Sequence, residues 1–238
     1  MIIDCHTIFG KWPKKPIDIS LERVLADMKR LGIDKAVSLD AAAIFLPHDE
    51  ANRRTLAAAS EHPVIIPACT FNMSMFYDGA DEVAGCLAQG FKVVRVFPDL
   101  QGWSYRSLTF MHLVELLAGK GVPLMAPALD GASIVELVEV AGGKGFPILL
   151  GEVKYRNIPE VILAAKKCDD ILIDIHAVQP PDTLKILSRE VGVERLVFGT
   201  NMPLYSPSVR LLLVRRSGLS EADQEKILGG NLMRVLGL

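Results

Sequence analysis

Two patterns in the sequence predict an α/β fold, a single (β/α)8 TIM barrel. Eight short runs of β-branched and aliphatic residues recur along the chain, and stretches with helical spacing of apolar residues separate them. Such runs are typical of parallel strands that are covered on both faces. A length of 238 residues suits one barrel, so we expect one domain over residues 1–238. An open doubly wound sheet is the alternative, because a strand count made from one sequence is easily wrong by one or two.

The expected strands, in chain order, are Met1–Cys5, Ala36–Leu39, Val64–Ala68, Val93–Phe97, Pro123–Ala126, Ile148–Leu150, Ile171–Ile175 and Arg195–Phe198. Helices are expected between them, and two have recognisable caps. The first begins after Ser20 and ends at Gly32. The last begins at Ser220, and we expect the carboxylate of Asp223 to reach back to the backbone amide of Ser220 as in a capping box. The proline-containing segments 11–16 and 179–181 are expected to be loops.

Composition and charge restrict the kinds of molecule that this protein is expected to bind. The formal net charge is −2 and no basic run exceeds two residues, which disfavours nucleic acid and leaves a small molecule as the expected ligand. The four cysteines are widely spaced with no C-x-x-C pair, as expected for reduced thiols rather than a structural zinc site. No apolar run has the roughly 18 residues of a membrane helix, and the N-terminus lacks a signal-like segment. We therefore expect no membrane partner and a cytoplasmic location; a homo-oligomer stays open.

Three segments carry a resemblance to a known family. Ile3-Asp4-Cys5-His6-Thr7-Ile8 resembles an Asp-x-His-x-His strand, residues 196–203 (LVFGTNMP) resemble a Leu-x-Phe-Gly-Ser-Asp-x-Pro segment, and residues 230–237 (GNLMRVLG) resemble a Gly-Asn-Ala-x-Arg-Leu-Leu ending. In this order they resemble the amidohydrolase superfamily. The similarity is to its amidohydrolase-related branch, which includes aminocarboxymuconate semialdehyde decarboxylase and dicarboxylic lactone hydrolases. The resemblance implies a barrel of this type over nearly the whole chain.

The resemblance also implies one or two divalent metal ions, held by two histidines on the first strand, histidines after the fifth and sixth strands, and an aspartate on the eighth. Only His6 matches this set. Ile8 and Pro127 stand at two histidine positions, Glu152 at a third, and Asn201 at the aspartate position. Isoleucine and proline side chains offer no donor, and an amide cannot take a proton from metal-bound water. The usual two-metal centre is therefore expected to be absent.

A rebuilt site is the hypothesis that follows. His6, Glu152 and His176 form a two-histidine, one-carboxylate set suited to one divalent metal. With Asn201 they are the candidate catalytic residues, because all four follow predicted strands and should meet at one end of the barrel. Two alternatives stay open for the cofactor, a single divalent ion with zinc favoured, or none. In the second case the histidines are hydrogen-bonded residues that line a polar pocket.

The candidate substrate-binding residues are Asp4, Arg95, Lys154 and Arg156. Arg95 would hold a substrate carboxylate in bidentate fashion, or else extend outward between helices. Lys154 would bind an anion or simply pair with Glu152, and Asp4 would orient a network or be satisfied by backbone amides. The other histidines, His48, His62 and His112, are expected at the surface, and Cys5 in the core.

Two functions are carried forward. The first is a hydrolase or decarboxylase of the amidohydrolase type that acts on a small anionic substrate, with a remodelled metal site or with none, as the resemblance to metal-free lactone hydrolases of this branch allows. The second is a catalytically inactive barrel that serves as a binding or assembly module, since fold does not determine function.

Overall fold

The computed structural model describes residues 1–14, 16–179 and 182–238. Eight parallel strands form one sheet in the order β1 (Ile3–Asp4), β4 (Lys35–Ser38), β5 (Ile65–Cys69), β6 (Val93–Arg95), β7 (Leu124–Pro127), β8 (Ile148–Gly151), β9 (Ile171–Asp174) and β10 (Leu196–Val197). Each expected run contains or overlaps one of these strands. The order follows the chain without exception, as a barrel built from repeated strand–helix units requires.

Hydrogen bonds between the segments that directly follow the first and last strands close the sheet. The amide of Cys5 donates to the carbonyl of Phe198 at 2.8 Å, and the amide of Asn201 donates to the carbonyl of His6 at 2.8 Å. An isolated parallel bridge joins Thr7 to Met202. The barrel prediction is therefore confirmed over the open-sheet alternative.

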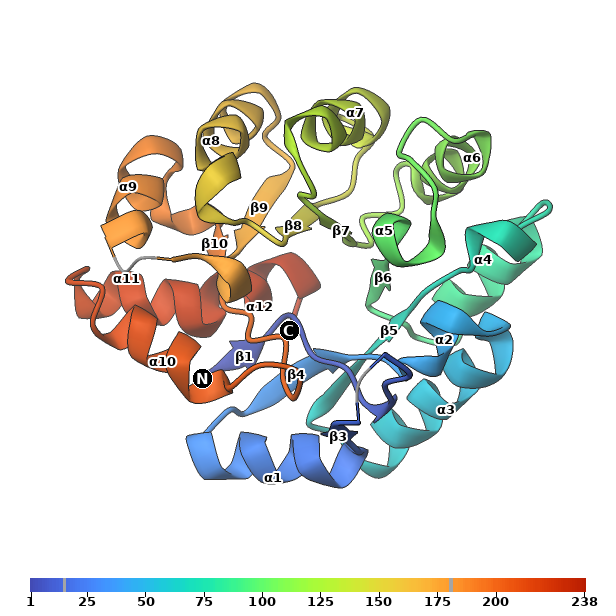
Figure 1. Cartoon of the computed structure of the whole chain (residues 1–238), viewed down its shortest axis with the longest axis horizontal. Coiled ribbons are helices and arrows are strands. Elements are labelled where there is room, and N and C mark those ends of the chain that lie inside the picture. The colour runs from blue at the N-terminus through green and yellow to red at the C-terminus, as the bar shows by residue number, and fades with distance from the viewer. Residues whose placement is uncertain (15, 180–181) are drawn as a thin grey trace.

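Helices surround the sheet on its outer side (Figure 1). They are α1 (Leu21–Leu31), α2 (Ala42–Phe45), α3 (His48–Glu61), α4 (Ala80–Ala88), α5 (Pro98–Gln101), α6 (Leu108–Leu117), α7 (Gly131–Ala141), α8 (Ile158–Lys167), α9 (Asp182–Val191), α10 (Pro207–Arg215), α11 (Glu221–Glu225) and α12 (Asn231–Leu236). Within the described ranges, none of these helices combines the length and the apolar character that a bilayer crossing needs.

The two expected helix caps differ in outcome. Ser20 accepts the amide of Arg23, and Gly32 closes α1 with a left-handed backbone at φ 66°, as expected. At α11 the hydroxyl of Ser220 accepts the amide of Asp223 at 3.1 Å and donates to the Asp223 carboxylate at 2.8 Å. The carboxylate was expected to accept the backbone amide of Ser220 but accepts its hydroxyl instead, so this part of the expectation is wrong.

Alternation along the strands sorts the core into two layers. Side chains such as Val37, Ile66, Val93 and Leu149 belong to one buried cluster inside the barrel, and their strand neighbours belong to another that packs against the helices. Arg95 lies two residues after Val93, so it shares the interior face. Strand alternation thus directs a charged side chain into the barrel at its C-terminal end.

One element was not expected. A two-stranded antiparallel ribbon joins β2 (Gly10–Lys11) to β3 (Asp18–Ile19), within and beside a segment expected to be a loop. Residue 15 of that segment, and residues 180 and 181 of the second expected loop, lie outside the described residues.

Candidate functional site

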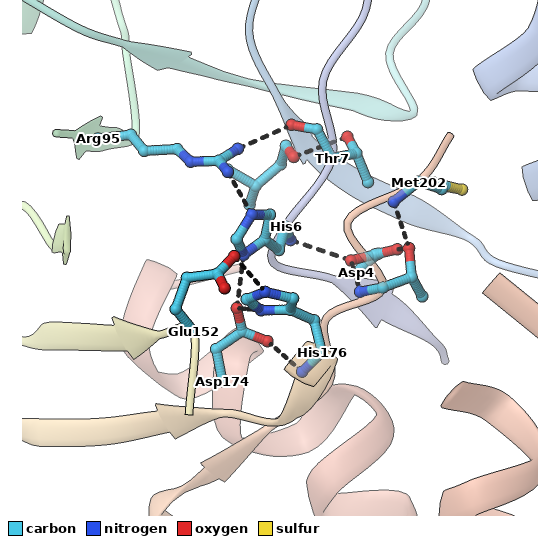
Figure 2. A network of polar contacts seen from close by, with 10 residues as sticks. Asp4, His6, Thr7, Arg95, Glu152, Asp174, His176 and Met202 are labelled. Atoms are coloured by element: carbon cyan, nitrogen blue, oxygen red, sulfur yellow. Dashed lines mark hydrogen bonds and ion pairs between the residues drawn. The ribbon is translucent and has the colours of Figure 1, made fainter. Parts of the chain in front are cut away.

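The predicted catalytic residues meet at the C-terminal ends of the strands. His6 follows β1, Glu152 follows β8 and His176 lies in the turn after β9 (Figure 2). Asn201 follows β10. The expectation that these four lie at one end of the barrel is confirmed. His6, Glu152 and Asn201 line one pocket of about 370 Å³. His176 lines a second pocket of about 430 Å³, which shares Glu152 with the first.

Asp174, the last residue of β9, joins the two histidines. Its Oδ2 lies 2.6 Å from Nδ1 of His6 and 2.7 Å from Nδ1 of His176. Its Oδ1 accepts the backbone amide of His176 at 2.9 Å. The carboxylate is fully buried, and the two imidazole rings lie 4.0 Å apart between centroids. Figure 2 shows both rings directed at this one carboxylate.

The contacts fix the protonation of each ring. His6 donates from Nδ1 to Asp174, while its Nε2 accepts from the guanidinium of Arg95, so the ring is neutral. Burial, followed by the charge of Arg95, lowers the pKa of His6 to about 3, in agreement with this state. His6 therefore carries an unprotonated nitrogen next to a cation.

His176 is the opposite case. It donates from Nδ1 to Asp174 and from Nε2 to Oε1 of Glu152 at 3.0 Å, so both nitrogens carry protons. Burial lowers the pKa of His176, but the charge and hydrogen bond of Asp174, with those of Glu152, outweigh burial and raise the pKa to about 9. His176 is thus a buried imidazolium held by two carboxylates.

Glu152 links the His176–Asp174 pair to the exposed Lys154. Besides His176 it contacts Nζ of Lys154 at 3.0 Å through Oε2. Burial raises the pKa of Glu152, but His176 and then Lys154 outweigh burial and hold the pKa well below its usual range. Its backbone has φ 55°, a left-handed conformation that costs a non-glycine residue energy and is retained mainly at functional sites.

Arg95 is buried at 6% exposure and points into the barrel. It donates to the carbonyl of Thr7 at 3.1 Å and to Nε2 of His6, and its guanidinium lies 4.8 Å from the ring centre of Phe97. Burial lowers the pKa of Arg95 to about 10, and the charge of Asp174 opposes this, so the group stays charged near neutral pH. The alternative in which Arg95 extends outward between helices is wrong, because its strand position faces the interior.

Asp4 orients the strand ends rather than the pocket. Its Oδ1 accepts the amides of His6 at 2.9 Å and Thr200 at 3.1 Å, and its Oδ2 accepts the Thr200 hydroxyl at 2.5 Å. It thereby ties the end of β1 to the end of β10. Burial raises the pKa of Asp4 to about 7, although the Thr200 hydrogen bond opposes the rise. Backbone amides and the Thr200 hydroxyl satisfy the carboxylate, and Asp4 lines neither of the two pockets, so its predicted part in substrate binding stays a prediction.

Asn201 lines the first pocket and carries an unsatisfied buried atom. Its Oδ1 is buried and has no hydrogen-bond partner among the described residues. The residue is 6% exposed and has φ 54°, again left-handed. Buried polar atoms without partners are rare and call for a ligand or a water.

A glycine makes room for this cluster. A Cβ added to Gly199 would lie 2.0 Å from Oδ1 of Asp174 and 3.0 Å from Sγ of Cys5. Only glycine at this position lets Asp174 take the place from which it reaches both histidines.

The sequence model of the Amidohydrolase family matches residues 3–238. The chain belongs to the amidohydrolase family. No curated protein matches it. Among solved structures it is similar to 5-carboxyvanillate decarboxylase from Sphingomonas paucimobilis, with 15% identity, TM-score 0.76 and coverage of 100% of this chain and 99% of that one.

Two further structures share this fold. The 2,6-dihydroxybenzoate decarboxylase from Rhizobium has 14% identity and TM-score 0.75, with 99% and 98% of the two chains covered. A probable 2-pyrone-4,6-dicarboxylic acid hydrolase from Acinetobacter baumannii, with citric acid bound, has 14% identity and TM-score 0.76, with 100% and 99% covered. At these identities the likeness shows the barrel alone.

The amidohydrolase site contains a buried His–Asp–His cluster, His6, Asp174 and His176, whose donor atoms lie within 4.8 Å of one another. Their spacing is that of hydrogen bonds, 2.6 and 2.7 Å from Asp174 to each ring. Two ligands of a tetrahedral ion with bonds of about 2.05 Å would stand about 3.3 Å apart. The donors are also engaged, since Arg95 binds Nε2 of His6 and Glu152 binds Nε2 of His176. As arranged, this cluster does not fit a divalent ion, and a guanidinium is the cation beside His6.

The remaining predicted residues lie elsewhere. Lys154 and Arg156 line the second pocket and not the pocket of Arg95. His48 was expected at the surface but is 4% exposed, because Glu82 covers its Nε2 at 3.1 Å and the amide of Asn72 its Nδ1 at 3.2 Å. Cys5 is fully buried, as expected.

Asp174 was missed as a site residue. The signal that identifies it is a repeated Asp-x-His pattern, Asp4-Cys5-His6 and Asp174-Ile175-His176. In both, the aspartate accepts the backbone amide of the histidine two residues later.

Proposed function

We propose that this amidohydrolase-family chain is a hydrolase that cleaves an ester or lactone bond in a small anionic substrate, without a metal ion. The observation that carries the proposal is the neutral His6, held by Asp174 at Nδ1 and by a buried cation, Arg95, at Nε2. A general base oriented by a carboxylate and placed beside a fixed positive charge is the combination that acyl transfer needs.

Each group has a separate task. The guanidinium of Arg95 pairs with a substrate carboxylate, a bidentate contact stronger than its single contact with His6. This frees Nε2 of His6, which accepts a proton from water as the water oxygen bonds to the substrate carbonyl carbon. His6 returns that proton to the leaving oxygen when the carbon–oxygen bond breaks, and Asp174 stabilises the intervening imidazolium.

The surrounding residues hold this geometry. His176 keeps Asp174 ionised and oriented, and Glu152 holds His176 as an imidazolium, so we propose both as positioning residues. Asn201 lines the same pocket, and its side-chain amide is the proposed partner of a substrate hydroxyl or of the attacking water. Asp4 fixes the backbone of His6.

The pocket supports an aromatic or heterocyclic carboxylic acid as substrate. Its other wall is apolar, with Trp12, Ile44, Phe97 and Leu100, and its volume of about 370 Å³ suits a small molecule. The similar structures bear the names of enzymes of carboxyvanillate, dihydroxybenzoate and pyrone dicarboxylic acid. Decarboxylation of such acids is a second candidate, which two of these three names favour.

The test is turnover of a panel of carboxylated aryl esters, pyrones and hydroxybenzoic acids by chelator-treated protein. We expect hydrolysis that survives chelation and falls at least about a hundredfold in His6→Gln, the range that general bases contribute. His62→Gln is the matched control and should keep full activity. Carbon dioxide release in place of hydrolysis would identify a decarboxylase. Activity that returns only with zinc would establish the competing one-metal site, and binding without turnover would favour the inactive barrel.

A further inference from the structure

A second pocket opens beside the first. It has a volume of about 430 Å³ and shares Glu152 and Tyr205 with the pocket of His6. Its lining is strongly basic. The cationic residues are Lys154, Arg156, His176 and Arg210, and Glu152 is the single carboxylate among the lining residues that the structure describes.

Two members of this set are buried, His176 and Arg210 on α10, and only His176 is held by carboxylates among the described residues. Arg210 is 7% exposed, and its Nη1 donates to the carbonyl of Val178 at 2.9 Å. Its Nε is buried without a hydrogen-bond partner among the described residues. Within the same residues it forms no ion pair with a carboxylate, unlike buried charges in general. The buried guanidinium of Arg210 therefore has no anionic partner among the described residues, although its N–H groups are suited to bind one.

The rest of the lining can supply further donors. Lys154 and Arg156 are exposed at the pocket's edge. Among the described residues, the side chain of Lys154 makes an ion pair with Glu152, and that of Arg156 donates to the carbonyl of Leu129. Both side chains retain N–H groups for a ligand. A buried anchor with exposed cations around it is the arrangement that captures compact oxyanions.

We propose that this second pocket binds a compact oxyanion, a carboxylate or a phosphate group, with the guanidinium of Arg210 as its buried anchor and Lys154 and Arg156 at its edge. The site goes beyond the proposed function, because neither Arg95 nor His6 lines it. It also reassigns Lys154 and Arg156 from the substrate of the first pocket to a second ligand.

The shared wall links the two pockets. Glu152 contacts Lys154 on one side and His176 on the other. An anion that pairs with Lys154 weakens its contact with Glu152, and Glu152 in turn holds the imidazolium behind Asp174. Occupancy of the second pocket is therefore expected to change the environment of His176.

Calorimetric titration with inorganic phosphate and with acetate tests the proposal, and the tighter of the two identifies the anion class. We expect one-to-one binding that weakens about tenfold or more in Arg210→Gln and severalfold in Arg156→Gln, since each removes a charged donor. Arg106→Gln, a change at an exposed arginine of another surface, should bind like the wild type.

Three results would overturn the assignment. The first is that the wild type binds neither anion, and the second is that all variants bind with equal affinity. The third is that Arg95→Gln loses binding while Arg210→Gln retains it, which would place the anion in the first pocket. If Arg210→Gln fails to fold, Arg156→Gln and Lys154→Gln decide, since both residues are exposed. Failure here leaves hydrolysis through His6 untouched.

Discussion

Replacing Arg95 with alanine tests how much this buried guanidinium contributes to the stability of the fold and to the pKa of His6. The guanidinium makes two hydrogen bonds from a buried charge, to the Thr7 carbonyl and to Nε2 of His6. Bonds of this kind contribute about 1.5–3 kcal/mol each, but water that enters the adjoining pocket can replace part of them. We therefore expect a loss of about 3 kcal/mol in the free energy of unfolding. For a chain of 238 residues this lowers Tm by about 6–12 °C.

The same change should alter His6. Loss of the neighbouring positive charge removes one of the two main causes that lower its pKa, so the pKa of His6 rises above about 3, while burial keeps it below the ordinary value. Denaturant unfolding and NMR titration of the histidine ring measure the two effects. Arg106→Ala is the control, an exposed arginine in a surface ion pair, and should cost less than about 1 kcal/mol. Wild-type stability together with an unchanged His6 pKa in Arg95→Ala would refute the reasoning.

Two further substitutions test the aspartate at the centre. Gly199→Ala should displace Asp174, since the new Cβ would lie 2.0 Å from its Oδ1, and we expect a loss of several kcal/mol with release of both histidines, read by unfolding and by ring NMR; an unaffected variant would contradict the packing. Asp174→Asn should lower the pKa of His176 from about 9. The raised pKa of His176 corresponds to a stabilisation of the folded state of about 3 kcal/mol. This stabilisation is fully present below the ordinary pKa of 6.5 and is lost as the pH rises through about 9. The stability deficit of Asp174→Asn should therefore be larger between pH 3.8 and 6.5, the ordinary pKa values of the two groups, than above about pH 9, and a pH-independent deficit would contradict it.

The barrel was predictable because each strand is a run of residues covered on both faces, a pattern local to the sequence. The meeting of the four candidate catalytic residues was predictable once the strands were placed, because residues that follow parallel strands lie at the same end of the barrel. These residues are His6, Glu152, His176 and Asn201. The inward direction of the Arg95 side chain could also have been predicted, because Arg95 lies two residues after Val93 and therefore on the same face of the strand. A charged residue in a strand was, however, equally compatible with a side chain that extends outward between helices.

Other features depend on contacts between distant segments. His48 begins a helix, a position that favours exposure, and only the packing of Glu82 and Asn72 against it makes it buried. Asp174 ends a strand, and its contacts with both histidine rings require the space that Gly199 leaves for its carboxylate. The division of the cationic residues between two pockets was likewise unpredictable, because it depends on how the loops after the strands fold over the barrel end.

The protonation of the two histidines at near-neutral pH tests the central claim most directly. In protein labelled with ¹⁵N at histidine, we predict that His6 carries one proton, on Nδ1, with an unprotonated Nε2, and that His176 carries protons on both nitrogens. Zinc added to one equivalent should leave both patterns unchanged. A His6 protonated on both nitrogens, or zinc-induced loss of the Nδ1 protons from both rings, would contradict a metal-free site built on a neutral base and an arginine.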